Sequence, residues 1–217
     1  MTEEEIKAVA LQLGHPQGEE GIKVAAKLHE INGSMIQRTI DLLHCRDQDT
    51  VLEIGPGNGG YAPYVLSRAA GIHYYGIDIS ATVIELAKEN LAAEIAAGTA
   101  SFILGNGVEL PYTDNFFDKV FTVNTLYFWE DPLQQLAEIY RVLKPGGILI
   151  PGIRSPHYMK TLPFTQYGFR MYDATQAAAL LEKAGFSIAD TVEENVEIKT
   201  ERKTEVDERI YIVAKKP

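Results

Sequence analysis

Three observations in the 217-residue sequence predict an α/β fold with a doubly wound, mostly parallel sheet and an N-terminal helical lobe. From residue 50 onward, short apolar runs alternate with helix-like segments, a rhythm that favours parallel βαβ units. The first apolar run ends in the glycine-rich sequence GPGNGG at residues 55–60. The residues before that run show only helical periodicity. We therefore expect a helical lobe, or lid, at residues 1–46 and a sheet domain at residues 47–217.

The helical lobe is predicted to begin with a capped amphipathic helix. The sequence TEEE at residues 2–5 has the form of a capping box, and apolar side chains recur after it at helical spacing. The sequence GHPQG at residues 14–18 ends this helix. A second helix is expected at residues 19–30, and the sequence ING that follows interrupts it. Ser34 would then cap a third helix that extends through Leu43.

The sheet domain is expected to alternate strands with helices. Its parallel strands are predicted at residues 50–54, 73–77, 100–104, 119–123 and 148–153. Its helices are predicted at residues 61–70, 81–97, 132–143 and 174–184. Ser80 and the pair Asp131-Pro132 are suited to helix N-termini. Two final segments, at residues 187–195 and 208–215, alternate apolar and polar side chains, which indicates an antiparallel hairpin at the edge of the sheet.

Composition argues against several classes of function. The formal net charge of −10 disfavours a nucleic-acid partner, since phosphate binding requires clustered lysine and arginine. No apolar run is long enough to predict a membrane span. The five histidines show no close metal-ligand spacing, so no metal site is expected. An acidic N-terminus and a single cysteine, Cys45, favour a cytoplasmic protein without disulfides. The sequence makes no prediction about the oligomeric state.

The turn after the first predicted strand carries the clearest functional signal. Gly55, Gly57 and Gly60 satisfy the pattern G-x-G-x-x-G, in which bare main chain approaches a nucleotide cofactor. Glu53 adds a carboxylate at the end of the same strand. Asp78 ends the next strand, where a carboxylate accepts hydrogen bonds from both hydroxyl groups of a ribose. That ribose fits NAD and S-adenosylmethionine equally well, and Asp78 alternatively caps the helix that follows.

An ordered set of segments resembles a known family. The sequence EIGPGNG at residues 53–59 resembles motif I of the class I S-adenosylmethionine-dependent methyltransferases, and GIDIS at residues 76–80 resembles their acidic second-strand motif. LPY at residues 110–112 and NFFD at residues 115–118 resemble the segment before their fourth strand. LKPGG at residues 143–147 resembles the turn before their fifth strand. The order and spacing of the segments make the resemblance specific.

The resemblance implies a Rossmann-like, seven-stranded sheet that ends in an antiparallel hairpin, with S-adenosyl-L-methionine as the cofactor. The glycine-rich turn would face the amino acid part of the cofactor, Asp78 would bind the ribose hydroxyls, and Ile79 would pack on the adenine ring. Asn106 stands where the commonest family pattern has aspartate, and its amide oxygen can still accept a hydrogen bond from adenine; a plain turn asparagine is the alternative. The predicted cofactor-binding residues are Glu53, Gly55, Gly57, Gly59, Asp78, Ile79, Asn106, Gly107, Val108, Asn124 and Thr125.

Residues beyond the fourth and fifth strands are expected to form the acceptor pocket, because ligands of open α/β sheets bind beyond the carboxyl ends of the strands. Aromatic residues there are either core packing or pocket walls that attract the sulfonium cation of the cofactor. His157 is the candidate general base by position, with a surface histidine as the alternative. The predicted substrate pocket consists of Tyr127, Trp129, Arg154, Tyr158, Phe164 and Tyr167.

These features favour methyl transfer to a small-molecule acceptor by in-line displacement. Because the sulfonium is already a good leaving group, the protein chiefly has to position the acceptor and exclude water. A general base is needed only if the acceptor has to lose a proton. Two alternatives stay open: a non-catalytic protein that binds S-adenosylmethionine, and an NAD-dependent oxidoreductase, which would need a hydride-transfer site.

Overall fold

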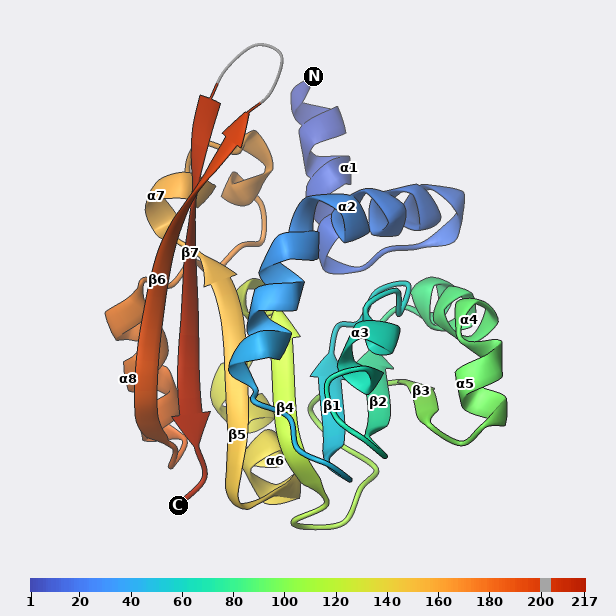
Figure 1. Cartoon of the computed structure of the whole chain (residues 1–217). Helices are drawn as coiled ribbons and strands as arrows, with labels where there is room; N and C mark the ends of the chain where they lie inside the picture. Colours follow the sequence, from blue (N-terminus) through green and yellow to red (C-terminus); the bar gives the residue numbers. More distant parts are fainter. Residues whose placement is uncertain (200–203) are drawn as a thin grey trace.

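The computed structural model describes residues 1–199 and 204–217, which form a seven-stranded sheet with helices on both faces (Figure 1). The strand order is β3-β2-β1-β4-β5-β7-β6. The strands are β1 (Thr50–Ile54), β2 (His73–Asp78), β3 (Ala100–Leu104), β4 (Phe117–Val123), β5 (Leu143–Arg154), β6 (Ser187–Lys199) and β7 (Thr204–Lys215). The strands β1 to β5 pair in parallel, whereas β7 runs antiparallel to β5 and β6. The predicted fold class and C-terminal hairpin are confirmed; the hairpin connection at residues 200–203 lies outside the described residues.

The helices cover the sheet in two groups. They are α1 (Glu3–Gly14), α2 (Gly18–Leu42), α3 (Ala62–Leu66), α4 (Ala81–Asn90), α5 (Ala92–Ala96), η1 (Leu126–Phe128), α6 (Pro132–Val142), α7 (Pro156–Met159), η2 (Pro163–Gln166) and α8 (Ala174–Lys183). Successive residues of β1 point to opposite faces, as the pleat requires. Val51 packs in a buried cluster with α2, α3 and α4, and Leu52 packs in another with α6 and α8.

Three of the predicted helix N-termini are confirmed by their hydrogen bonds. The hydroxyl of Thr2 accepts from the backbone N–H of Glu5 at 3.2 Å, and the Glu5 carboxylate accepts from the backbone N–H of Thr2 at 2.7 Å, which completes the capping box. Ser80 caps α4. Asp131 accepts from two backbone N–H groups of α6, whose first residue is Pro132.

The predicted break between the second and third helices is wrong. One continuous helix, α2, passes through the sequence Asn32-Gly33, and it changes direction about halfway along (Figure 1). Both residues are buried. A Cβ atom at Gly33 would lie 2.1 Å from the hydroxyl oxygen of Tyr61, so glycine is needed here for close packing. Ser34 lies inside this helix and does not cap one.

Other boundaries differ from the predictions by a few residues. The helix predicted at residues 81–97 is divided at Leu91 into α4 and α5. The helix predicted at residues 61–70 is reduced to the five residues of α3. β5 begins at Leu143, which pairs with Phe117 of β4 before the register shifts. These differences leave the sheet edge that carries the predicted site unchanged.

Candidate functional site

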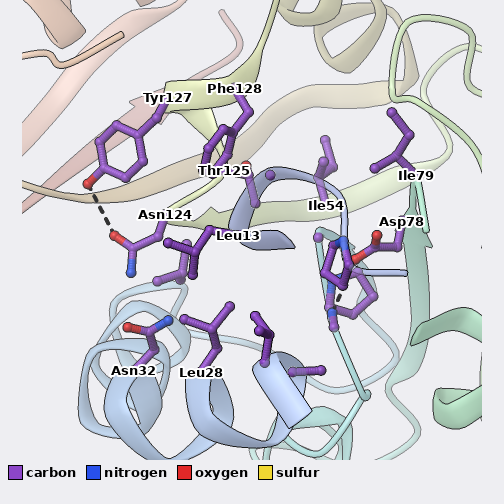
Figure 2. Close-up of a pocket in the computed structure, with 18 of the residues that line it drawn as sticks. Leu13, Leu28, Asn32, Ile54, Asp78, Ile79, Asn124, Thr125, Tyr127 and Phe128 are labelled. Carbon is purple, nitrogen blue, oxygen red and sulfur yellow. Dashed lines mark hydrogen bonds between the residues drawn. The ribbon is translucent and has the colours of Figure 1, made fainter. Parts of the chain in front are cut away.

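A cavity of about 540 Å³ lies beyond the carboxyl ends of β1, β2, β4 and β5 and is bordered by residues of α1 and α2. Figure 2 draws many of the residues that line it. Most of the predicted site residues line this cavity: Glu53, Gly55, Gly57, Asp78, Ile79, Asn106, Asn124, Thr125, Tyr127, Trp129, Arg154, Tyr158 and Phe164. The other predicted residues lie outside the lining: Gly59, Gly107, Val108, His157 and Tyr167. The structure thus gathers the cofactor and acceptor candidates around one space.

The glycine-rich turn presents bare backbone to the cavity. Gly55 and Gly57 have φ angles of +78° and +55°, a region that residues with a side chain rarely adopt. A Cβ atom at Gly55 would lie 2.4 Å from a methyl carbon of Thr125, whereas nothing lies within 4 Å of such an atom at Gly57. Gly59, with φ of +70°, packs instead against Phe102. The turn therefore needs glycine for backbone conformation at each position and for close packing at Gly55 and Gly59.

The carboxylate of Asp78 sits beside this turn. One of its oxygens accepts from the backbone N–H of Ser80 at 2.9 Å, and the other accepts from the backbone N–H of Gly57 at 3.3 Å. Burial raises the pKa of Asp78, and these two hydrogen bonds oppose the rise. Each carboxylate oxygen keeps acceptor capacity after these bonds. The group therefore fits a pair of neighbouring hydroxyls, as on a ribose.

The carboxyl group of Glu53 is buried on the same side of the cavity, with only 4% of the residue exposed. The hydroxyl of Tyr74 donates to its Oε2 atom at 2.5 Å. Burial raises the pKa of Glu53 to about 8; the hydrogen bond from Tyr74 opposes this rise and the charge of Asp78 adds to it. A cation in the cavity would favour the ionised form of Glu53.

The loop after β3 is held by a residue that the sequence analysis did not single out. The side-chain oxygen of Asn106 accepts from the backbone N–H of Val108 at 3.0 Å, so Asn106 makes the local turn that was its alternative interpretation. Gln135 of α6 donates its Nε2 to the backbone oxygen of Asn106 at 2.9 Å. Gln135 lines the cavity, and its Oε1 has no hydrogen-bond partner among the described residues. In the sequence, Gln135 is one polar residue within a helical pattern, so nothing there indicated that it would hold the loop after β3.

Beyond β4, a hydrogen-bond network holds an unusual backbone conformation. Asn124 has φ of +58°, which is uncommon for a residue other than glycine. The hydroxyl of Tyr127 donates to the side-chain oxygen of Asn124 at 3.1 Å and accepts from the backbone N–H of Arg154 at 2.5 Å (Figure 2). The hydroxyl groups of Thr122 and Thr125 are hydrogen-bonded to each other. Tyr127 thus ties the end of β4 to the end of β5.

The far end of the cavity is apolar and partly built from the N-terminal helices. Figure 2 shows Leu13, Leu28 and Asn32 facing Asn124 and Tyr127 across the cavity, away from Asp78 and Ile79. The apolar residues at this end are Val9, Leu13, Leu28, Ile36, Phe128, Met159, Leu162, Phe164 and Phe169. Helical periodicity predicted an apolar face on these helices, yet it could not indicate that the face borders a cavity.

The N-terminal helices are also fastened to the opposite, polar end of the cavity. The hydroxyl of Ser80 donates to the backbone oxygen of Pro16. The backbone N–H of Gly18 donates to the hydroxyl of Thr82 at 3.1 Å. Both bonds join the connection between α1 and α2 to the start of α4, next to Asp78.

Of the predicted catalytic and substrate-pocket residues, His157 and Tyr167 do not line the cavity. The side chain of His157 is 85% exposed, and its Nδ1 atom lies 2.7 Å from an oxygen of Glu208. Tyr167 lies beside α1, where the ammonium of Lys7 is 5.3 Å from the centre of its ring. The general-base role of His157 stays a prediction, and this arrangement places its imidazole outside the space where the ligands would meet.

The described residues hold no group of three or more histidine, cysteine, aspartate or glutamate side chains arranged to bind a metal ion. No helix within residues 1–199 and 204–217 is both long and apolar enough to span a membrane.

An open α/β sheet with a bare glycine turn and a neighbouring acidic strand end defines a protein that binds a nucleoside cofactor. A family model described as a methyltransferase domain matches residues 52–150. The ubiquinone/menaquinone biosynthesis C-methyltransferase UbiE of Marinomonas sp. (strain MWYL1) is 31% identical over 185 residues, which cover 80% of this chain and 70% of that protein. The chain therefore belongs to the class I S-adenosylmethionine-dependent methyltransferases, whose cofactor is S-adenosyl-L-methionine.

Further comparisons agree with this fold. The uncharacterized methyltransferase YdaC of Bacillus subtilis (strain 168) is 34% identical over 116 residues, or 54% of this chain and 62% of YdaC. Among solved structures, the complex between the Haloferax volcanii Trm112 methyltransferase activator and a putative methyltransferase matches with a TM-score of 0.77 and 20% identity, over 98% of both chains. For several curated relatives, the match spans only 44% to 62% of their length.

Proposed function

We propose that this protein transfers the methyl group of S-adenosyl-L-methionine to a small organic acceptor. The observation that carries the proposal is one continuous cavity of about 540 Å³, which joins the glycine turn and Asp78 to an apolar space bordered by α1 and α2. A cofactor bound along the turn would leave the apolar end for a second molecule. In-line transfer requires this arrangement, because donor and acceptor have to meet with water excluded.

The residues at the polar end fit the cofactor in a definite orientation. Asp78 would bind the ribose hydroxyls, Ile79 would pack on the adenine, and the loop at residues 105–108 would border its edge. The turn at residues 55–59 would face the amino acid part, with Glu53 beneath it. When bound, the cofactor supplies a methyl group on a positively charged sulfur.

The protein's own part in the reaction is positioning. Asn124 and Thr125 lie on the lining between the two ends of the cavity, and the hydrogen bonds of Tyr127 fix that segment. Aromatic rings at this point, including Trp129, would stabilise a nearby cation. An acceptor that is already acidic needs no general base. A base role for His157 would require α7 to move, since its imidazole lies outside the lining.

Several features support a small-molecule acceptor rather than a macromolecular one. Residues 1–46 would act as a lid over the sheet domain at residues 47–217, and helices above the cavity limit the size of what enters. The net charge of −10 opposes binding to nucleic acid. A single cysteine favours work in the cytoplasm, where thiols stay reduced.

The proposal is tested in two stages. Isothermal titration with S-adenosylhomocysteine measures cofactor-site binding; no heat at about 1 mM ligand would contradict the proposed site. The protein is then incubated with S-adenosylmethionine carrying a deuterated methyl group and a library of small acceptors. A product heavier by one labelled methyl group supports methyl transfer. Binding in the first stage without any such product in the second would favour the non-catalytic alternative.

A further inference from the structure

The apolar end of the cavity contains one buried cation, the guanidinium of Arg154. Only 7% of Arg154 is exposed, and it lines the cavity. Lys27 also lines the cavity, but its side chain is 67% exposed and pairs with Glu30. The carboxylates of the described lining, Glu53 and Asp78, stand at the opposite, cofactor end. Arg154 is therefore the charged group that an acceptor would meet.

The hydrogen bonds of Arg154 fix its guanidinium but do not use all of its donors. Its Nε donates to Asp207 at 2.7 Å, one Nη donates to Asp207 at 3.2 Å, and the other donates to the side-chain oxygen of Asn32 at 2.7 Å. A guanidinium has five N–H donors. Two of them have no acceptor among the described residues. The guanidinium is therefore held by two residues, Asp207 and Asn32, and keeps two donors for a ligand.

Among the side chains around Arg154 that are more than nine-tenths buried, the charges do not balance. Arg209, which is 4% exposed, also donates to the carboxylate of Asp207, at 2.8 Å. Two buried guanidiniums thus share one carboxylate that is itself fully buried. The nearby carboxylate of Glu208 is engaged by Ser155 and His157. Because a buried charge is costly unless it is paired, an anionic group in the cavity would complete this cluster.

We infer that the acceptor is an apolar organic acid, whose anionic oxygen binds Arg154 and whose hydrocarbon or aromatic body fills the apolar end of the cavity. This inference rests on the proposed function. The Tyr158 ring, whose centre is 5.8 Å from the Arg154 guanidinium carbon, and Phe164 would flank the apolar body. Arg154 is a specificity-determining residue in this arrangement, and it holds the acid as an anchor, because a guanidinium partner lowers the nucleophilicity of the oxygen that it binds.

The inference is tested with matched ligand pairs that differ in charge. Protein saturated with S-adenosylhomocysteine is titrated calorimetrically at about pH 7.5 with naphthaleneacetate and naphthaleneacetamide, and with decanoate and decanamide. The acid of each pair should bind about tenfold or more tightly than its amide, because charge-assisted hydrogen bonds are the strong ones. The saturating titration is itself the test of the cofactor site, so a failure there is distinguished from a failure of this inference.

Two variants then test whether Arg154 is the residue that causes the preference for acids. In Arg154→Gln, the dissociation constants of each acid and its amide should differ by no more than about twofold, while S-adenosylhomocysteine still binds. Arg170→Gln is the control, because Arg170 is exposed near the same end of the cavity but does not line it; this variant should keep the preference.

Any one of three results would overturn the inference. The amides could bind wild-type protein as tightly as their acids, or the preference for acids could persist in Arg154→Gln. The third result is that neither ligand pair binds wild-type protein at about 1 mM. The wild-type comparison decides the question even where the substitution prevents folding.

Discussion

The buried carboxyl group of Glu53 should make the free protein less stable at alkaline pH. Burial raises its pKa from the ordinary value of 4.5 to about 8. A group with a higher pKa in the folded state holds its proton more tightly there. Its contribution to stability is therefore complete below about pH 4.5 and is lost as the pH rises through about 8. The linkage relation gives a loss of about 3 kcal/mol in the free energy of unfolding between pH 6 and 9.

Glu53→Gln removes this titration and keeps an acceptor for the hydroxyl of Tyr74. Without ligand, the free energy of unfolding of the variant relative to wild type should rise by about 2–3 kcal/mol from pH 6 to pH 9. Urea denaturation at the two pH values measures it. Glu109→Gln, at an exposed position, is the matched control and should follow wild type. If the free energy of unfolding changed equally with pH in Glu53→Gln and in wild type, the reasoning would be refuted.

Three further predictions concern the polar end of the cavity. Asp78→Ala should weaken S-adenosylhomocysteine binding about tenfold or more in isothermal titration, because two ribose hydroxyls lose their acceptor. Gly55→Ala should lower the free energy of unfolding by about 1–3 kcal/mol in urea denaturation, because its Cβ would clash with Thr125. Gly57→Ala should lower the free energy of unfolding by less, because nothing lies near a Cβ atom at that position. Gln135→Leu should weaken S-adenosylhomocysteine binding about fivefold, as measured by titration, because the loop after β3 loses a hydrogen bond.

Each of these predictions has a clear contrary result. Unchanged affinity in Asp78→Ala would remove the ribose assignment. Equal stability losses at Gly55 and Gly57 would mean that backbone strain alone decides the cost. Gln134→Leu is the neighbouring control for Gln135→Leu, and equal effects of the two would point to general destabilisation of α6.

The positions of the strands along the chain and three helix N-termini were predictable because their causes are local. Thr2, Ser80 and Asp131 cap helices through side chains that reach backbone only two or three residues away. The continuity of α2 was not predictable in this way. Asn32 and Gly33 favour a break by themselves, but Arg154 and Tyr61, distant in sequence, contact them inside the fold.

The same distinction between local and distant causes applies to the residues of the candidate site. The turn at residues 55–59 and Asp78 were recognisable because main-chain geometry and one carboxylate leave a short sequence pattern. Arg154 and Tyr158 were placed by topology alone. Gln135 and the cavity-lining side of Leu13 and Leu28 were missed, because their place depends on how helices pack across the sheet edge.

The attachment of the connection between α1 and α2 to Ser80 and Thr82 has a consequence for turnover. These bonds lie next to Asp78. In the proposed arrangement, the helices above the acceptor and the residue that binds the ribose would therefore be held at the same place. If the proposed function holds, breaking these two bonds would free the demethylated cofactor and would also open the space above the acceptor. Exchange of both molecules with solvent would then be governed by one opening event.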